Sequence, residues 1–389
     1  MYRWFESRLD PFPADPPRQP PRSLYAFCRH YTRGAEPWLL LMAFTTAGIA
    51  IAELALYAYV GSLVDRLGST TPATFLDAEG GRLLWMGVLV LLALPAMVLL
   101  NSLVQHQTLL GNFPMRIRWN VHRYLLRQSM GYFQDEFAGR IATKLMQTSL
   151  AVRETVIKLL DIGNYVLVFF AGTLAVAASS DWRLMLPFAA WIAGYSLLMW
   201  HFVPRMEKIS RAQADARSVM TGRVVDSYTN IATVKLFSHS NREETYAREA
   251  MDQFLDTAYR QMRLFTVLNV AVLWSNALLL FGVASTGIWL WLNGLMTPGA
   301  LAVSLGLVMR FQGMSQWVMW EMSSLFENIG TVKDGISSIS LPRIVSDDKA
   351  ATAIGTVKGD IKFENVSFHY GKTSGVIDNL DLHIRPGEK

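Results

Sequence analysis

The chain has 389 residues, of which 51% are hydrophobic and 17% are charged. Soluble domains carry about 25% charged residues, so this composition excludes an ordinary soluble protein and favours a membrane protein. The net charge of +5 is compatible with nucleic-acid binding, but the basic residues lie between apolar blocks, which argues against that function.

The N-terminal residues 1–22 are expected to form a disordered tail, because Pro11–Arg22 (PFPADPPRQPPR) is rich in proline and charge. The apolar run after Pro37 is too long for the core of a signal peptide, so we expect the N-terminus to be retained. Ser23–Tyr31 (SLYAFCRHY) is amphipathic. It is either an interfacial helix or a plain helical lead-in to the first span. Its single cysteine, Cys28, excludes an intrachain disulfide and has no metal-ligand spacing around it.

Six apolar blocks follow, each long enough to cross a bilayer core of about 30 Å. A soluble domain of this size cannot bury six such helices. The third block is short for a span and can begin earlier, within the helix that precedes it. The predicted spans are Trp38–Leu63, Leu83–Val104, Ile162–Ala178, Leu184–Val203, Leu264–Trp291 and Ala300–Trp320.

The distribution of Lys and Arg predicts the orientation of these spans. Segments 114–154 and 205–263 together contain seventeen Lys and Arg residues. The loops on the opposite side contain few, among them Arg82 and Arg183. Basic residues concentrate in cytoplasmic loops, so both long segments and both termini are predicted to be cytoplasmic.

The two long basic segments are predicted to be helices that continue beyond the membrane. There is no proline from Met115 to Asp161 or from Arg205 to Phe281, and glycines are few. Each segment must therefore contain one helix that leaves the membrane and a second helix that returns to it. The first reversal is expected around Tyr132–Ala138 (YFQDEFA), and the second around Met220–Asn230, where Gly222 interrupts the pattern.

The pattern changes after the sixth span. Its helix is expected to continue to about Ile339, and a linker is expected over 341–358. Asp360–His369 (DIKFENVSFH) and Val376–Ile384 (VIDNLDLHI) alternate like strands. About 30 residues cannot bury a core. We therefore interpret 359–389 as the incomplete start of a further domain, the alternative being a short hairpin tail.

Three features of the sequence match one known family. Gly359–Gly371 (GDIKFENVSFHYG) and Val376–Lys389 (VIDNLDLHIRPGEK) resemble the opening of an ABC nucleotide-binding domain. Tyr132–Leu145 (YFQDEFAGRIATKL) resembles the first intracellular loop of ABC exporters. The six spans with two long cytoplasmic hairpins also fit. The chain thus resembles an ABC exporter half-transporter.

The resemblance implies a mainly α, polytopic membrane fold. Six long transmembrane helices with cytoplasmic extensions would form a transmembrane domain over 23–340. The first strands of an α/β ATPase domain would follow. Tyr370 matches the A-loop aromatic that stacks on the adenine of ATP; otherwise it is a packing residue between strands. The phosphate-binding loop is absent from these residues, so no catalytic or metal-binding residue is expected here. ATP with Mg²⁺ is expected to act in a full-length protein.

The resemblance also implies coupling residues, which would dock onto a nucleotide-binding domain. The alternative is that these residues form solvated turns between helices. They are Tyr132, Phe133, Asp135, Glu136 and Phe137 in the first cytoplasmic reversal, and Gly222 and Asp226 in the second.

A substrate path is expected among polar residues within the spans, since such residues are functional candidates by default. Glu53 is the one acid well inside an apolar block. It can bind a cationic group, take part in a proton-linked step, or pair with a polar neighbour for structural reasons. Asn276, Trp317 and Glu321 are expected to line a cavity formed by the last two spans, although Trp also concentrates at membrane interfaces.

The function implied by the resemblance is ATP-driven export of a hydrophobic or amphipathic substrate (lipid, drug or peptide) by alternating access. The expected partners are the bilayer, ATP and a second half-transporter, and the expected location is a bacterial inner membrane. Two alternatives remain open: a secondary transporter, which should show inverted repeats, and a membrane scaffold without an ATPase.

Overall fold

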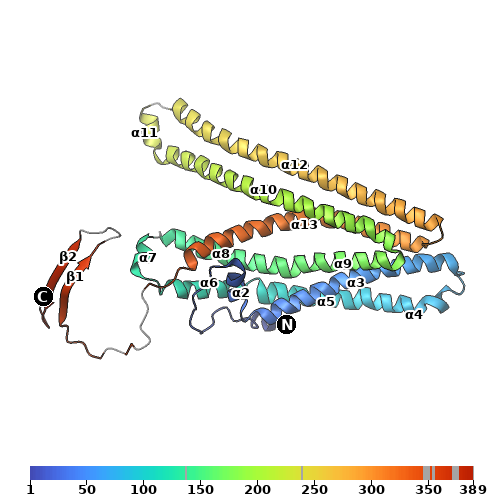
Figure 1. Cartoon of the computed structure of the whole chain (residues 1–389), viewed down its shortest axis with the longest axis horizontal. Helices are drawn as coiled ribbons and strands as arrows, with labels where there is room; N and C mark the ends of the chain where they lie inside the picture. The colour runs from blue at the N-terminus through green and yellow to red at the C-terminus, as the bar shows by residue number, and fades with distance from the viewer. Residues whose placement is uncertain (136–137, 238–239, 345–350, 353–354, 370–375, 389) are drawn as a thin grey trace. The chain divides into compact units, whose positions relative to one another are not determined.

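The computed structural model describes residues 1–135, 138–237, 240–344, 351–352, 355–369 and 376–388. These residues divide into two units, Met1–Pro342 and Arg343–Lys389. The first unit is helical and the second contains two strands (Figure 1). The fold class expected from the sequence is confirmed.

Long helices dominate the first unit. Four of them are single elements: α3 (Glu36–Ser69), α10 (Trp182–Thr229), α12 (Ser240–Leu292) and α13 (Pro298–Ile339). Two others contain π-helical segments, which add one residue to a turn. The first is built from α4 (Phe75–Val88), η1 (Leu89–Ala93), α5 (Leu94–Ser102), η2 (Leu103–Leu109) and α6 (Asn112–Leu125). The second is built from α8 (Ala138–Lys158), η3 (Leu159–Gly163) and α9 (Asn164–Ser180).

Among the residues that the structure describes, five helices are long and apolar enough to cross a membrane, and they contain the first five predicted spans. The third span does begin earlier than the apolar block, as one continuous helix from Gly139 to Ser180. The sixth block lies in α13, which is 42 residues long but is not among those five. Arg310, Gln312 and Gln316 lower the hydropathy of this block.

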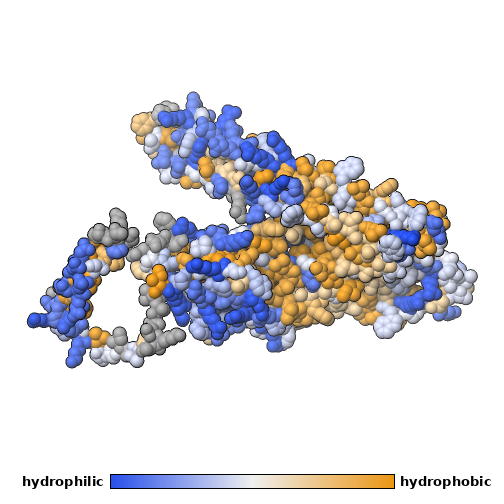
Figure 2. Space-filling model, viewed as in Figure 1, coloured by the Kyte–Doolittle hydropathy of each residue, from blue (hydrophilic) through white to orange (hydrophobic). Residues whose placement is uncertain are grey.

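Two hydrophobic cores hold the first unit together. One joins α3, α9, α10, α12 and α13, and its centre contains Phe188, Trp191 and Phe311. The other joins the N-terminal segment, α6, α8 and the end of α13. Figure 2 shows hydrophobic surface over the bundle and hydrophilic surface at the end of the α10–α12 hairpin. Bulky apolar side chains such as Trp200 (79% exposed) face outward, which is the pattern expected of a lipid-facing surface.

The reversal between the fourth and fifth predicted spans lies later in the chain than the sequence predicted. Helix α10 continues to Thr229, the short helix α11 (Ile231–Leu236) follows, and α12 returns. Gly222 and Asp226 therefore lie within the last turns of α10 and not in a loop. A single glycine costs a helix only about 1 kcal/mol, and the pairing of α10 with α12 outweighs that cost.

The first reversal is built differently. Helix α7 (Met130–Asp135) follows α6, and α8 begins at Ala138. Tyr132 is buried at 8% exposure, and its hydroxyl donates to the Ser338 carbonyl over 3.4 Å. Phe133 stays 39% exposed.

The N-terminal segment differs from the expected disordered tail. Helix α1 (Tyr2–Glu6) buries Phe5, and Leu9 beyond it is only 2% exposed. The proline-rich residues that follow have few amide hydrogens but many free carbonyls, and side chains of α6 donate to those carbonyls. Helix α2 (Leu24–Thr32) then buries Phe27 and Tyr31. Burial there raises the pKa of Cys28 to about 11, as expected of a structural thiol.

The second unit is an antiparallel pair of strands, β1 (Ile361–Phe368) and β2 (Ile377–Ile384). Both lie within the ranges that alternation predicted. The register shifts on either side of Val366, and Asn365 and Asn379 adopt positive φ. Asn tolerates this region better than most residues.

Candidate functional site

A cavity of about 360 Å³ lies inside the first unit, between α3, α5, the η3–α9 junction and α13. Its size suits a small organic ligand. Its lining combines apolar, aromatic and ionisable side chains: Thr46, Ile49, Glu53, Asn101, Asp161, Ile162, Tyr165, Arg310, Gly313, Met314 and Trp317.

Glu53, Tyr165 and Arg310 form a closed polar cluster on one wall of the cavity. The Arg310 guanidinium donates to Glu53 Oε2 over 2.9 Å and to the Tyr165 hydroxyl over 2.7 Å. The Tyr165 hydroxyl donates to Glu53 Oε2 over 2.6 Å. The sequence left three roles open for Glu53: binding a cationic group, a proton-linked step, or structural pairing. The geometry supports the third, because Glu53 is paired with Tyr165 and Arg310.

The close approach of α3 and α9 positions this cluster. Gly172 lets Leu54 pack against the α9 backbone, where an added Cβ would lie 2.2 Å from Leu54 Cδ1. Leu54 follows Glu53 directly and belongs to the same core as Phe169, one turn after Tyr165. Packing therefore fixes the backbone on both sides of the Glu53–Tyr165 contact.

A second polar group, centred on Asp161, also lines the cavity, one helical turn before Tyr165. Asn101 Nδ2 donates to Thr46 Oγ1 over 2.9 Å, and Thr46 Oγ1 donates to Asp161 Oδ1. Gln105 Nε2 lies 3.5 Å from Asp161 Oδ2. Asp161 lies in η3 and Gln105 in η2, so π-helical segments carry both side chains.

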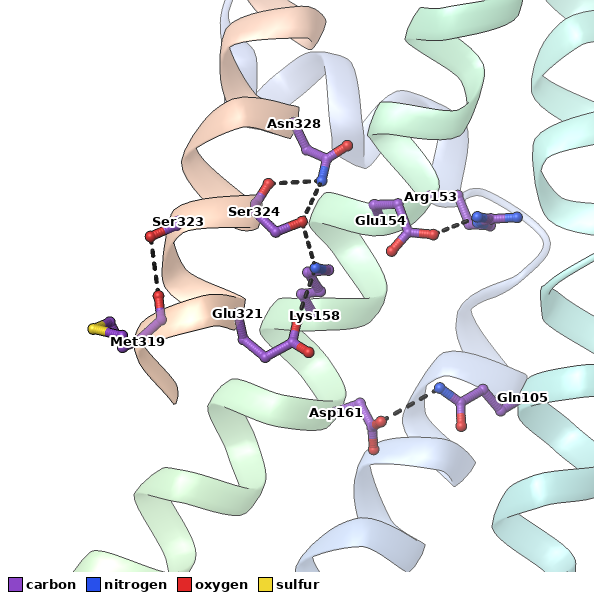
Figure 3. A network of polar contacts seen from close by, with 10 residues as sticks. All are labelled: Gln105, Arg153, Glu154, Lys158, Asp161, Met319, Glu321, Ser323, Ser324 and Asn328. Carbon is purple, nitrogen blue, oxygen red and sulfur yellow. Dashed lines mark hydrogen bonds and ion pairs between the residues drawn. The ribbon is translucent and has the colours of Figure 1, made fainter. Parts of the chain in front are cut away.

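A third polar group lies one turn before Asp161 on the same helix (Figure 3). Lys158 Nζ donates to Glu321 Oε2 over 2.8 Å and to Ser324 Oγ over 2.7 Å. Glu321 was predicted to line a cavity, but it is instead half of an ion pair between α8 and α13.

Asn276 also has a packing role rather than an open one. It is 6% exposed, accepts from Trp191 Nε1 over 3.1 Å and donates to Ser315 Oγ over 3.0 Å. It therefore ties α10, α12 and α13 together. Trp317 does line the cavity, where its ring meets Tyr165 edge-on at 6.2 Å between centroids.

The remaining predicted site residues divide into two sets. Tyr132, Phe133, Gly222 and Asp226 lie at or near the ends of the helical hairpins, as described above. Glu136, Phe137 and Tyr370 lie outside the described residues, and so does the side chain of Asp135. Within the described residues, no group of three or more His, Cys, Asp or Glu side chains has the arrangement of a metal site.

Two charged residues of the cavity, Arg310 and Asp161, were not predicted from the sequence. Arg310 lies in the middle of the sixth predicted span, where a lone charge is itself a signal. Asp161 directly precedes the third predicted span. Extending that span toward its preceding helix would have placed a second acid within the membrane region.

Comparison with known families decides the class of this bundle. The family described as the ABC transporter transmembrane region matches residues 39–314, which reach from α3 to α13. The chain belongs to this family. It is accordingly an integral membrane protein with an ABC exporter transmembrane domain.

Individual relatives agree with this ABC transporter assignment. An uncharacterized ABC transporter ATP-binding protein of Haemophilus influenzae is 42% identical over the whole chain, which spans 63% of that relative. A beta-(1→2)glucan export ATP-binding/permease protein of Nitrobacter winogradskyi is 22% identical over 92% of the chain, which spans 60% of that relative. The chain thus spans less than two thirds of either protein.

A solved structure shares the fold of this ABC transporter domain. It is a bacterial Atm1-family ABC exporter with ATP bound, which aligns with a TM-score of 0.66 at 18% identity. The alignment covers 92% of this chain and 62% of the other. At this identity the likeness concerns the fold alone.

Proposed function

We propose that this chain is the membrane half of an ATP-driven exporter, which moves a hydrophobic or amphipathic substrate across a bacterial inner membrane by alternating access. The observation that carries the proposal is a cavity lined by both ionisable and apolar side chains inside an apolar bundle of the ABC transporter transmembrane family. Ionisable groups are expensive in a membrane and are retained where they act on a ligand or on a conformational change.

Glu53 and Trp317 belong to the proposed substrate path directly, since both line the cavity. Glu321 and Asn276 act on it indirectly. The Glu321–Lys158 pair joins α13 to α8, and Asn276 joins α12 to α10 and α13. Movement of α13 relative to these helices would change the shape of the cavity.

Coupling to nucleotide is proposed at the ends of the helical hairpins. Phe133 offers an exposed aromatic ring on α7, with Asp135, Glu136 and Phe137 after it. On the α10–α12 hairpin, Asp226 and Gly222 precede a tip with exposed apolar side chains such as Tyr228 (71%) and Leu236 (81%). Tyr132 supports the first tip from within, because its ring is buried.

The second unit is proposed as the beginning of the ATP-binding domain, from about residue 359, joined by a linker over 341–358. Tyr370 would stack on the adenine of ATP, a role that rests on the resemblance of its flanking residues. ATP with Mg²⁺ would then act in the full-length protein. Two copies, or one copy and a related partner, would enclose the transport path, with both termini on the cytoplasmic side.

The test uses the full-length protein in lipid nanodiscs, with spin labels at two exposed positions at opposite ends of the bundle. Leu236 lies at the hairpin tip and Leu76 lies near the start of α4. With ATP and vanadate, the distance between the two Leu236 labels of a dimer should shorten, while the distance between the two Leu76 labels should lengthen. Distances that do not respond to nucleotide would refute alternating access driven by ATP.

A further inference from the structure

The charge balance of the cavity defines a substrate class. We propose that the cavity binds the ammonium group of an amphipathic organic cation at Asp161 and Asn101, with the apolar part of the ligand against Tyr165 and Trp317. This inference rests on the proposed export function, whose cargo it specifies.

The lining contains two carboxylates and one cation. Glu53 is already paired with Arg310 over 2.9 Å, which neutralises that wall. Asp161 is contacted by the neutral side chains of Thr46, Asn101 and Gln105 and has no ion-pair partner among the described residues. The cavity therefore keeps one carboxylate without a counter-ion, and a ligand that brings a positive charge would supply it.

The nearest alternative counter-ion is already occupied. Lys158 lies three residues before Asp161 on the same helix, but its ammonium is bonded to Glu321 and Ser324 on α13. Figure 3 shows the two side chains diverging, with Lys158 directed to Glu321 and Asp161 directed to Gln105. Arg310 is likewise committed to Glu53 and Tyr165.

The directions of the hydrogen bonds at Thr46 leave a second buried acceptor, Asn101 Oδ1, without a donor in the part of the chain that the structure describes. Thr46 uses its hydroxyl proton on Asp161 and so accepts from the Asn101 amide nitrogen. That order fixes the Asn101 amide with its oxygen turned away from Thr46. Asn101 Oδ1 is buried and has no hydrogen-bond partner among the described residues. A buried acceptor without a donor is costly, and an ammonium N–H would satisfy it.

The remaining lining suits the apolar part of such a ligand. Trp317 keeps 39% of its surface exposed although it lies at the cavity. Its edge-on contact with Tyr165 forms an aromatic corner next to Ile49 and Met314. An aromatic face also attracts a cation that lies within about 6 Å of the ring.

Backbone geometry supports a ligand site here. Asp161 lies in η3 and its neighbour Gln105 lies in η2, so one polar contact joins two π-helical segments. Such segments are rare, weaken the regular helix and are frequent at functional sites.

The test compares two probes of nearly the same shape, 4-phenylbutylammonium and the neutral 4-phenyl-1-butanol. Binding to the purified full-length protein in detergent is measured by isothermal titration calorimetry. We expect the cation to bind on the order of tenfold more tightly or better, because a charged hydrogen bond is worth more than a neutral one. Equal binding of the two probes to the unaltered protein would overturn the proposal, whatever the variants do.

Two Asp-to-Asn variants then locate the site. Asp161→Asn should lose most of the preference for the cation. Asp77→Asn, the same change at an exposed position on α4, should keep it. If the preference survives in Asp161→Asn, the site is elsewhere and the proposal fails. The proposed export function is judged separately by the nucleotide-driven spin-label distances, which do not require any cation to bind.

Discussion

At the scale of single residues, the Glu53–Arg310 pair shows why charges persist inside the bundle. Arg310 brings a permanent charge into the sixth predicted span, and Glu53 and Tyr165 both contact it. Removing one partner leaves the other charge without compensation, which costs more than replacing both.

The pair can be tested by a double-mutant cycle in the full-length protein. Glu53→Gln alone and Arg310→Gln alone should each destabilise the fold by about 1–2 kcal/mol, less than a fully buried pair because Arg310 is partly exposed. The variant with both changes should be less destabilised than the sum of the two. Thermal unfolding in one detergent measures all four proteins, and strictly additive losses would show that the two residues do not interact.

The same residues show what sequence can and cannot supply. Glu53 was detectable because an acid in an apolar block stands out locally. Its partners, Tyr165 on α9 and Arg310 on α13, are separated from it by 112 and 257 positions. No local pattern specifies such contacts. Asn276 and Glu321 were recognised as polar residues in or next to a span, but their bonding partners required the packed bundle.

At the scale of elements, helices were predictable because hydropathy and the absence of proline act within one segment. The strands β1 and β2 were predictable for the same reason, since alternation is local. The turn after α10 was placed too early because Gly222 and the following polar residues weaken a helix only slightly. The packing of α10 on α12, which sequence alone does not show, decides where the reversal falls.

The crossing of α3 and α13 depends on two glycines. A Cβ on Gly299 would lie 2.1 Å from the Gly61 carbonyl oxygen. Next to this contact, Asp65 Oδ1 accepts from the Gly299 amide over 2.7 Å and Asp65 Oδ2 accepts from Thr297 Oγ1 over 2.7 Å. An acidic side chain thus caps the first turn of α13, where it is favourable to the helix dipole.

Gly299→Ala should therefore destabilise the full-length protein, by about 1–3 kcal/mol, because the backbones must separate to admit the methyl group. Gly194→Ala on α10 is the matched control. No atom lies within 4 Å of its added Cβ, so it should be neutral or stabilise the helix by up to about 1 kcal/mol. Melting temperatures in detergent compare the two. Equal melting temperatures would show that the α3–α13 crossing opens at little cost.

At the scale of the whole first unit, the two hydrophobic cores define two separately packed parts of the helical bundle. The core of α1, α2, α6, α8 and the end of α13 is fastened by polar contacts. The Tyr124 hydroxyl donates to the Leu341 carbonyl over 2.6 Å, and Ser340 Oγ donates to the Pro21 carbonyl over 3.1 Å. By contrast, α10 and α12 pack chiefly on each other beyond the bundle (Figure 1). The end of α13, which leads into the linker, is thus anchored to the N-terminal part.

Composition alone suggested that residues 1–22 are disordered, and this expectation depends on how proline is interpreted. A proline-rich strand cannot pair through its own amides, yet its carbonyls remain available. Arg123 donates to the carbonyls of Pro13, Ala14 and Asp15 over 2.8–3.1 Å, and Trp119 also donates to Pro13. The donors lie about 110 positions away, which is why only the folded chain reveals the contact.

Arg123 should therefore hold the N-terminal segment in place. In Arg123→Ala, the three contacts to the carbonyls of Pro13, Ala14 and Asp15 are lost, while the contacts from Trp119 to Pro13, from Arg116 to Asp10 and from Ser340 to Pro21 remain. We expect trypsin to cut after the exposed Arg18 and Arg22 several-fold faster. Cleavage of a locally opened segment follows the population of its open form. Arg127→Ala, at an exposed position in the turn after the same helix, removes a charge and a tryptic site and should leave the rate of cleavage after Arg18 and Arg22 unchanged. Mass spectrometry of the released peptides reports both rates, and equal rates in the two variants would show that α6 does not retain the segment through Arg123.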